Sequence, residues 1–394
     1  MPDDKELDSL KARMDAIRNA GVAASDTDGA ATTETSYQQP QATAMPTMQK
    51  PVVSEDKVVG EAAERPAGPV GLDIGTSHVV VAQNKDNQIH TVQDLNAFFT
   101  VPNAKFSRDI LDQKGIMYYE KDGLFYIVGA SADSFAHMFH LETRRPMKEG
   151  LISADESEGL SVIKAVVGSL IQKPKTFGEV LCFGIPGEPL DGKGSIVYHE
   201  AVIKQSLSAL GYSPISLNEG MAAVLTELSA DDFTGIGISL GGGMCNVCLS
   251  YLSFPVITYS LQLGGDYIDA IVGRMVAEPA TKIKSIKETE LDFTSDAKDR
   301  VTIALQIFYD ELIFRLLESV QRVLAASDKI PKIAVPIPIV LSGGTAMPKG
   351  FREKFENTLK TVNLPIDISS VRIAEDPLNT TAKGALIMAM TEAE

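Results

Sequence analysis

Three short glycine-rich turns, each at the end of an apolar strand pattern, constrain this sequence more than any other feature. They are Asp73-Ile74-Gly75-Thr76-Ser77-His78, Ser239-Leu240-Gly241-Gly242-Gly243-Met244 and Ser342-Gly343-Gly344-Thr345-Ala346-Met347. Glycine carries no Cβ, so its backbone N–H groups can approach an anion such as a phosphate closely. A single turn of this kind usually serves only to reverse the chain. Neither the GxxxxGK[ST] nor the GxGxxG nucleotide pattern occurs.

The segments around the turns predict an α/β fold, because strand and helix patterns alternate along the chain. Residues 70–74 and 79–81 flank the first turn as a hairpin, and residues 235–240 and 247–252 flank the second. The longest expected helix covers residues 296–326. Its apolar residues recur at steps of three and four: Val301, Leu305, Phe308, Leu312, Leu316, Val320 and Val323. Further helices are expected at 157–172, from Gly264, from Pro348 and from about Asn379. Ligands of such folds bind where strands end.

The N-terminal segment has a different composition from the rest. Residues 1–20 have one apolar stripe (Leu7, Leu10, Met14, Ile17) and predict a short amphipathic helix, either simply solvated or binding a protein partner. Residues 21–68 are rich in Ala, Thr, Gln and Pro and almost lack aromatic residues. Such a stretch cannot bury enough apolar surface to offset its ordering entropy, so we expect a disordered linker.

The net charge and the absence of targeting signals restrict the kind of protein this sequence can encode. The formal charge is −16, from 52 acidic and 36 basic residues, which argues against a general nucleic-acid binder. The charged N-terminus is no signal peptide, and no run approaches the roughly 20 apolar residues that span a bilayer. We expect a cytoplasmic protein. Peripheral contact with the inner membrane face, through residues 1–20 or 137–141, stays open.

Two motifs suggest metal chemistry, but each has a simpler interpretation. Cys245 and Cys248 form C-x-x-C within a strand, where residues three apart point to opposite faces, so we expect buried small hydrophobic residues. His137 and His140 form H-x-x-H without the acidic partner of a metalloprotease.

The order and spacing of the turns resemble the actin-like ATPase superfamily, in which two related lobes clamp a nucleotide. Asn218-Glu219-Gly220-Met221-Ala222-Ala223 and Ala382-Lys383-Gly384-Ala385 resemble the two connectors between its lobes. Within the superfamily the chain is most similar to the bacterial actins MreB and MamK. Arg145 to Ile152 resembles their R-P-[LM]-x-[DE]-G-[VL]-I, and Leu263 to Asp269 resembles their strand-to-helix G-G-D/N segment.

The resemblance implies a two-lobed actin-like α/β fold behind the N-terminal arm. The first lobe would cover residues 69–217, with a smaller subdomain at about 96–130. The second would cover 218–378, with a smaller subdomain at about 266–330, and residues 379–394 would return to the first lobe as a helix.

The resemblance also implies a site for ATP and Mg²⁺ between the lobes. Asp73 would hold Mg²⁺ through water, and Glu219 would orient the attacking water. The implied nucleotide-binding residues are Asp73, Gly75, Thr76, Ser77, His78, Gly241, Gly242, Gly243, Met244, Gly264, Gly265, Asp266, Lys284, Gly343, Gly344, Thr345, Ala346 and Met347. The segment from Thr281 to Lys284 resembles E-R-I-K, with threonine in place of the glutamate.

One departure from the family pattern bears on catalysis. The second turn of the family reads D-x-G-G-G-T, whereas this chain has Ser239 and Met244 at its ends. A serine cannot neutralise metal charge, so hydrolysis should be slow although binding survives. Gly220 stands where proline is usual and is expected to loosen Glu219.

The leading function is therefore an MreB/MamK-like cytoskeletal protein that binds ATP and assembles head-to-tail into filaments, with a weak ATPase if any. The alternative is a non-polymerising, nucleotide-gated adaptor of the pilus-assembly or division type. A chaperone fragment or a small-molecule kinase on the same fold is disfavoured, because no peptide-binding region follows and no substrate-activating aspartate is evident.

Overall fold

The computed structural model describes residues 66, 68–138, 143–192, 194–328, 330–333 and 335–393. The chain divides into two compact units, Met1–Val58 and Val59–Glu394, and all described residues belong to the second. The expected helix at 1–20, nearly all of the expected linker at 21–68, and His140 lie outside the described residues.

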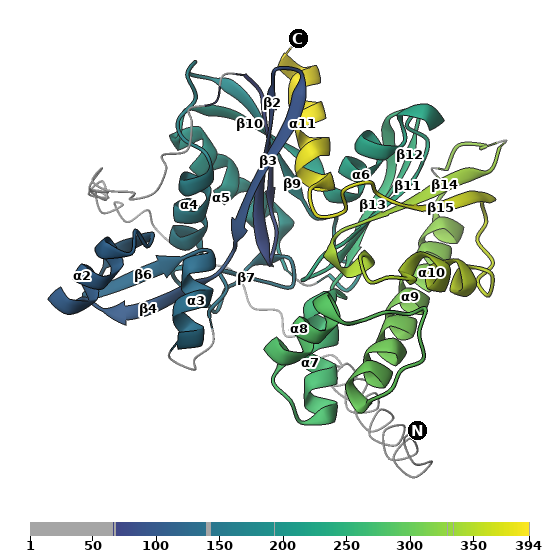
Figure 1. Cartoon of the computed structure of the whole chain (residues 1–394). Helices are drawn as coiled ribbons and strands as arrows, with labels where there is room; N and C mark the ends of the chain where they lie inside the picture. The colour runs from purple at the N-terminus through teal and green to yellow at the C-terminus, as the bar shows by residue number, and fades with distance from the viewer. Residues whose placement is uncertain are drawn as a thin grey trace, which may run out of the picture. The chain divides into compact units, whose positions relative to one another are not determined.

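A five-stranded sheet, called the first sheet here, forms one side of this unit (Figure 1). Its strand order is β10-β9-β1-β2-β3. The strands are β1 (Val70–Ile74), β2 (His78–Lys85), β3 (Gln88–Leu95), β9 (Glu179–Ile185) and β10 (Tyr212–Asn218). The expected hairpin around Gly75 is confirmed, because Ile74 pairs with Val79 in antiparallel register. β9 and β10 run parallel to β1.

A second sheet repeats this topology with the order β13-β12-β11-β14-β15. Its strands are β11 (Gly235–Leu240), β12 (Cys245–Tyr251), β13 (Phe254–Leu261), β14 (Ile337–Ser342) and β15 (Ile368–Ile373). In both sheets three antiparallel strands precede two parallel ones, and the first strand of the three lies at the centre. The repeat places the first and second glycine turns at equivalent positions, each after the central strand of its sheet.

Helices α6 (Glu219–Glu227) and α11 (Thr380–Ala393) lie between the two sheets (Figure 1). They approach each other and the sheets so closely that glycine is needed at the contacts. A Cβ on Gly71 of β1 would lie 2.1 Å from the Ala382 carbonyl oxygen, and one on Gly384 would lie 2.4 Å from that of Ala222. α11 is the final helix expected near Asn379.

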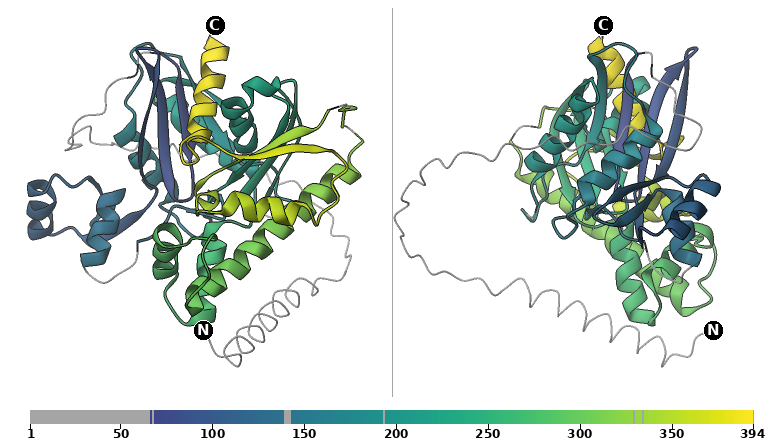
Figure 2. Two further views of the ribbon diagram at one scale, coloured as in Figure 1. Left: turned by 45° about the vertical axis from the view of Figure 1, so that its right-hand side comes forward. Right: turned by 90° about the vertical axis from the view of Figure 1, so that its left-hand side faces the viewer.

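Two insertions flank the sheets. The first holds the three-stranded sheet β4-β6-β5, which Figure 2 shows standing off the side of the first sheet. Its elements are β4 (Phe98–Pro102), α2 (Lys105–Gln113), β5 (Tyr118–Lys121), β6 (Leu124–Val128) and α3 (Ala130–Met138). The second insertion is helical and consists of α7 (Gly265–Val276), α8 (Ala280–Thr289) and the long α9 (Arg300–Ala326).

The remaining strands and helices lie around the two sheets. They are β7 (Met147–Lys148), β8 (Leu151–Ile152), α4 (Gly159–Leu170), α5 (Ile196–Ala209), η1 (Ser229–Asp231), η2 (Gly344–Ala346) and α10 (Phe351–Leu359). The expected helix from Pro348 instead begins at Phe351. Gly350, with φ of 83°, is in the left-handed region and caps the helix one residue before its start.

Of the buried apolar clusters, one lies beneath the first sheet and another between the sheets. Beneath the first sheet, β1 and β9 pack on α4 through Leu72, Phe183, Val162 and Val166. Between the sheets, α6 and α11 supply mainly alanines, which suits their close approach. The stripe of α9 is buried from Leu305 to Val320, as its periodicity predicts.

Candidate functional site

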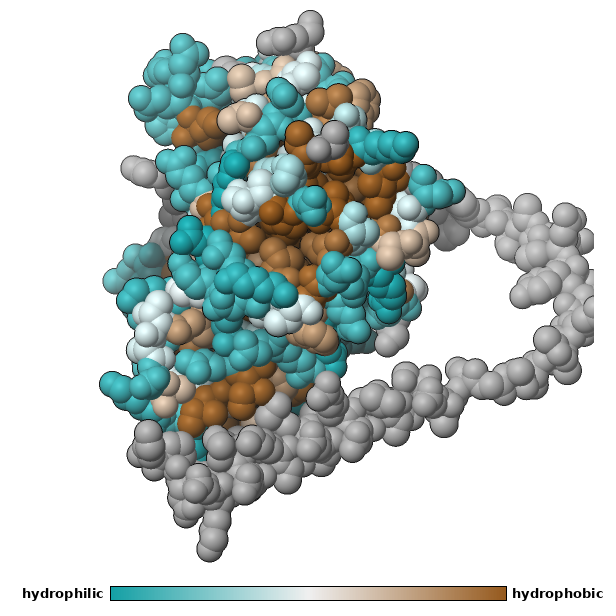
Figure 3. All heavy atoms as spheres, turned by 90° about the vertical axis from the view of Figure 1, so that its right-hand side faces the viewer, coloured by the Kyte–Doolittle hydropathy of each residue, from teal (hydrophilic) through white to brown (hydrophobic). Residues whose placement is uncertain are grey.

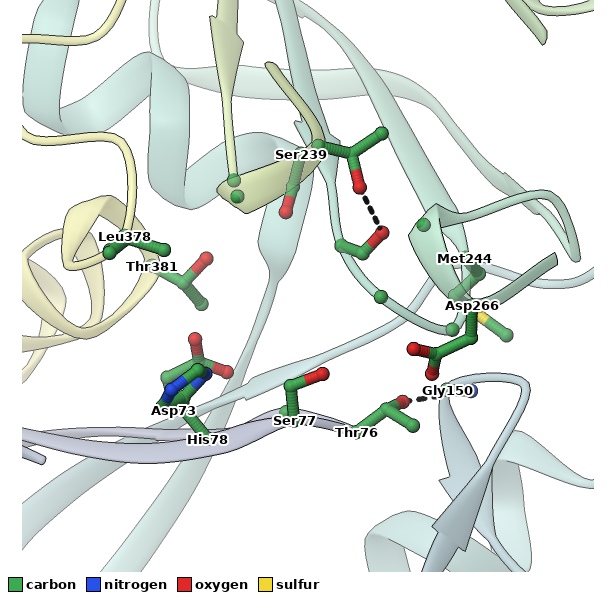
Figure 4. Close-up of a pocket in the computed structure, with 18 of the residues that line it drawn as sticks. Asp73, Thr76, Ser77, His78, Gly150, Ser239, Met244, Asp266, Leu378 and Thr381 are labelled. Carbon is green, nitrogen blue, oxygen red and sulfur yellow. Dashed lines mark hydrogen bonds between the residues drawn. The ribbon is translucent and has the colours of Figure 1, made fainter. Parts of the chain in front are cut away.

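A pocket lies between the two sheets, where the central strands end (Figure 4). All three glycine turns reach it, and so does the start of α6. The residues that line it are Asp73, Ile74, Gly75, Thr76, Ser77, His78, Val80, Gln93, Gly150, Glu219, Ser239, Gly241, Gly242, Gly243, Met244, Gly265, Asp266, Lys284, Lys287, Glu288, Gly343, Gly344, Thr345, Pro377, Leu378 and Thr381. Segments up to 308 residues apart thus meet at one place.

The first turn joins β1 to β2 and is closed by hydrogen bonds. The N–H of Gly75 donates to the His78 carbonyl at 2.8 Å. The buried Asn96 holds the turn from behind, because its side-chain amide donates to the Gly75 carbonyl at 2.9 Å. The Thr76 hydroxyl accepts the Gly150 N–H at 3.2 Å (Figure 4). These three hydrogen bonds fix the conformation of the turn.

The second turn joins β11 to β12 in the same manner, with the Gly241 N–H donating to the Met244 carbonyl at 3.0 Å. The N–H groups of Gly265 and Asp266, at the start of α7, donate to the carbonyls of Gly241 and Gly242 at 3.0 and 2.8 Å. The N-terminus of α7 was expected to face the nucleotide, but its first two N–H groups are hydrogen-bonded to the turn. α7 orients the loop instead.

The two turns face each other without room for side chains between them. A Cβ on Gly242 would lie 2.8 Å from the Ser77 hydroxyl oxygen, and one on Gly243 would lie 2.5 Å from that of Thr76. Bare backbone on one side therefore faces hydroxyl groups on the other. This arrangement can surround a small anion with hydrogen-bond donors.

Two carboxyl groups lie at the base of the pocket. Asp73 is the second-to-last residue of β1, and Glu219 is the first residue of α6. Both lie beside Gly184, where a Cβ would be 3.7 Å from the Asp73 Oδ1 and 3.5 Å from the Glu219 Cγ. The Ser239 hydroxyl and the Asn246 amide donate to the same oxygen, Glu219 Oε2, at 3.3 and 2.9 Å.

Burial disfavours charge on both carboxyls. It raises the pKa of Glu219 to about 7, although the hydrogen bonds from Ser239 and Asn246 act in the opposite direction. Burial, together with the charge of Glu219, raises the pKa of Asp73 well above its ordinary value. A cation beside these groups would be stabilised by the negative charge that they could then carry.

Basic side chains line the other wall of the pocket. Burial and the nearby Arg145 lower the pKa of Lys284. Lys287 is buried and donates to Asp269 Oδ2 at 2.7 Å and to the Gly265 carbonyl at 3.0 Å. This pair ties α8 to the first turn of α7 and places a positive charge at the pocket wall.

An ion pair spans the two sides of the pocket. The Arg145 guanidinium donates to Asp266 at 3.2 Å and to the Ser77 hydroxyl at 3.1 Å. Burial first, and then the charges of Lys284 and Arg145, lower the pKa of His78, so the imidazole is held neutral near pH 7.

Met244 makes an apolar contact between the two sides. It is buried with Leu151 and Ile196, and a Cβ on Gly150 would lie within 2.7 Å of three atoms of its side chain. The end of the second turn is therefore anchored by packing at the position where the family pattern has threonine.

The structure brings most of the residues proposed from the sequence into this pocket. Gly264, Ala346 and Met347 are the exceptions, because they do not line it. Ala346 is buried in the short helix η2, whereas Met347 is half exposed and faces a separate groove beside α10. Gly264 packs with its Cα against the Gly242 carbonyl, where a Cβ would lie at 2.3 Å. Its function is to let α7 approach the turn.

Sequence reasoning missed several lining residues, among them Gln93, Gly150, Lys287, Glu288, Pro377, Leu378 and Thr381. A signal existed for two of them. Lys287 and Glu288 follow Lys284 on α8 within little more than one helical turn, and residues three or four apart share a face.

The expected loosening of Glu219 by Gly220 finds no support in the packing. A Cβ on Gly220 would lie 2.7 Å from the Cys248 backbone nitrogen, so glycine lets α6 pack tightly on the second sheet. The Asn218 side chain also caps this helix by accepting the N–H groups of Gly220 and Met221.

The cysteines behave as buried apolar residues. The Cys245 thiol donates to the Leu263 carbonyl, while Cys248 packs on Met221. Burial raises the pKa of both thiols to about 12. No group of three or more potential metal ligands among His, Cys, Asp and Glu occurs within the described residues. The side chain of His137 is not described, so the H-x-x-H motif is not tested.

Two sheets of the same topology, with a pocket between them and two helices crossing there, define the actin fold. The chain belongs to the volactin family, whose pattern matches residues 69–389. No curated protein sequence matches it. None of the described helices is both long and apolar enough to cross a bilayer.

Solved structures share this fold at low sequence identity. A MamK double helical filament is 17% identical, with 82% of this chain and 98% of that chain covered at a TM-score of 0.63. MreB 5 of Spiroplasma citri bound to AMPPNP is 13% identical, with 84% and 98% covered at a TM-score of 0.61. A non-polymerising MamK mutant bound to AMPPNP is 17% identical, with 83% and 99% covered at a TM-score of 0.53. The resemblance to MreB and MamK is thus confirmed for the fold.

Proposed function

We propose that this chain binds ATP with Mg²⁺ in the pocket between its sheets and assembles into head-to-tail filaments. The observation that carries the proposal is that one pocket collects all three glycine turns together with Asp73 and Glu219. MreB 5 and a MamK mutant, which share the fold, are bound to AMPPNP in their structures.

The residues present suit a nucleoside triphosphate and its metal ion. The facing turns offer backbone amides and the hydroxyls of Thr76 and Ser77 to phosphate oxygens. Lys284 and Lys287 add positive charge on one wall. Asp73 offers the carboxylate oxygen that a hydrated Mg²⁺ prefers. The bound Mg²⁺ would neutralise charge on the phosphates.

We propose slow hydrolysis, because the base of the pocket has lost a charge. Glu219 would orient the attacking water, a task that a carboxylate performs through hydrogen bonding. Ser239 stands where the actin-like superfamily usually has aspartate, and its hydroxyl donates to Glu219 instead of holding a hydrated metal. Binding depends on the backbone of the turns and should not suffer.

Filament assembly has separate support. The related MamK is seen as a double helical filament. An apolar area lies open on the side of the molecule that carries the second sheet (Figure 3), and areas of this kind commonly mark contacts between proteins. Contacts between unlike faces of identical subunits do not close and give open polymers.

Sedimentation of the full chain with and without Mg-ATP tests this proposal, with phosphate release measured in the same samples. Pelleting that depends on ATP and precedes slow phosphate release is the expected result. Equal pelleting with and without Mg-ATP, or phosphate release at many turnovers per minute, would contradict it. A chain lacking residues 1–68, run alongside, tests whether the N-terminal segment contributes to assembly or to partner binding.

The alternative function is a nucleotide-gated adaptor that does not polymerise. Ser239 in place of the usual aspartate favours it, because loss of a metal-orienting carboxylate suits a protein that is switched by bound nucleotide rather than one that hydrolyses it rapidly. ATP binding without pelleting at any protein concentration would support the adaptor over the filament.

Association with the inner membrane face remains a further proposal. Flotation of the full chain with anionic vesicles tests it, and a protein that stays at the bottom of the gradient would contradict it.

A further inference from the structure

Behind the base of the pocket, in contact with Glu219, lies a buried asparagine that the sequence patterns did not single out. Asn246 lies on β12, directly opposite Ser239 on β11. Its side chain is fully buried. The side-chain amide donates to Glu219 Oε2 at 2.9 Å, and its oxygen accepts the Gly187 N–H at 2.9 Å. Both ends of the amide are therefore occupied.

These two partners fix which way the amide faces. The Gly187 N–H needs an acceptor, so the Asn246 oxygen must point to it. The nitrogen then points to the Glu219 carboxyl. A swapped amide would leave two donors facing each other at Gly187 and two acceptors facing each other at Glu219, and each buried mismatch is costly.

Gly187 belongs to a segment that joins the two sheets. It follows β9 of the first sheet, and the next residues pair with Ser260 of β13 in the second. The Ser260 N–H donates to the Glu188 carbonyl at 2.9 Å, and the Leu190 N–H donates to the Ser260 carbonyl at 3.0 Å. A Cβ on Gly187 would lie 2.6 Å from the Tyr259 backbone, so the segment can only be this close as glycine.

We propose that Asn246 is a positioning residue for hydrolysis, which holds the Glu219 carboxyl in place and ties it to the segment that joins the two sheets. This inference rests on the proposed function, because it assumes that Glu219 acts on water at the phosphates. The Asn246 amide bonds to both Glu219 and Gly187. A shift of the second sheet relative to residues 187–190 would therefore move the Asn246 N–H group that orients Glu219.

Asparagine suits position 246 better than aspartate or alanine does. Aspartate has the same size and still accepts the Gly187 N–H, but as a carboxylate it has no proton to donate to Glu219, and it adds a third carboxyl beside Glu219 and Asp73. Alanine removes both hydrogen bonds. Asn246→Asp and Asn246→Ala thus separate loss of the donor from loss of the whole bridge.

The test compares ATP affinity with the rate of phosphate release in the full chain. Asn246→Asp and Asn246→Ala should lower single-turnover phosphate release about tenfold or more, because small displacements of a catalytic group have large effects on rate. The Kd for Mg-ATP should change less than threefold. Ser250→Ala is the matched control. Ser250 lies on the same strand, is also buried and loses one hydrogen bond, to the Phe233 carbonyl, far from Glu219.

A double-mutant comparison shows whether Asn246 acts through Glu219. In a Glu219→Gln background, Asn246→Ala should change the residual rate by less than twofold. An equal fold-change in both backgrounds would overturn the inference, and so would variants that release phosphate at the wild-type rate. Wild-type protein that binds Mg-ATP but releases no phosphate would overturn it as well, because Glu219 would have no reaction to serve.

Failure of the proposed function looks different, since wild-type protein would then not bind Mg-ATP at all. If Asn246→Ala does not fold, Asn246→Asp, of equal size, carries the test. Loss of the fold in both variants would identify Asn246 as a purely structural residue and overturn the inference.

Discussion

Replacing Glu219 by glutamine should remove a pH-dependent cost from the ligand-free fold. The pKa of this carboxyl is raised from its ordinary 4.5 to about 7 by burial. A carboxyl whose pKa is higher in the folded than in the unfolded chain favours folding fully only below the unfolded pKa. That favourable contribution is lost as the pH rises through 7.

The magnitude follows from the two pKa values. Each pKa unit corresponds to roughly 1.4 kcal/mol, so the full effect is about 3 kcal/mol, most of it between pH 5 and pH 8. Asp73 adds to it, because the charge of Glu219 helps to raise the pKa of Asp73. The buried His199, with a pKa lowered to about 4, acts in the opposite direction but is present in both proteins.

Urea denaturation at pH 5, 6, 7 and 8, in buffer with a chelator and without nucleotide, measures the effect. The free energy of unfolding of Glu219→Gln minus that of wild type should rise by about 2–3 kcal/mol from pH 5 to pH 8. Glu318→Gln, on the exposed face of α9, should follow the wild type at every pH. A difference that is flat with pH, or that falls, would refute the reasoning.

Three further predictions concern the pocket. Ser239→Asp should speed phosphate release from Mg-ATP about tenfold, since a metal-orienting carboxylate returns, and an unchanged or slower rate in a phosphate-sensor assay would count against this account of Ser239. Lys287→Met should lower the free energy of unfolding by about 3–5 kcal/mol, because it leaves Asp269 buried without its cation. A midpoint of urea denaturation equal to that of wild type would contradict this. Met244→Ala should cost about 2–4 kcal/mol and speed release of a fluorescent ATP analogue, whereas unchanged stopped-flow release would show that Met244 does not hold the two sides together.

The fold could be predicted from the sequence because its signals are local and regular. The α9 stripe follows from its periodicity, and the strand at 235–240 follows from its apolar run and the glycines that bound it. The first two turns could be recognised for the same reason. The resemblance implied two related lobes, but the strand order within each sheet came only from the structure, because it depends on pairing between distant segments.

The parts of the site that were missed depend on contacts that no local pattern encodes. Gln93 and Leu378 reach the pocket from strand β3 and from the loop before α11, far from any glycine turn. Met347 was assigned to the pocket although the chain turns away after η2 and is redirected by Gly350. Asn246 lacked any signal, since its importance comes from two partners, Glu219 and Gly187, that lie 27 and 59 residues away.

Isothermal titration calorimetry of the full chain with Mg-ATP tests the central claim most directly. One nucleotide should bind per chain, and Asp73→Asn should weaken binding of Mg-ATP more than that of ATP in excess chelator, because Asp73 is proposed to act through the metal. No binding heat and no change in melting temperature with wild-type protein, at millimolar Mg-ATP, would contradict the claim that this pocket is a nucleotide site.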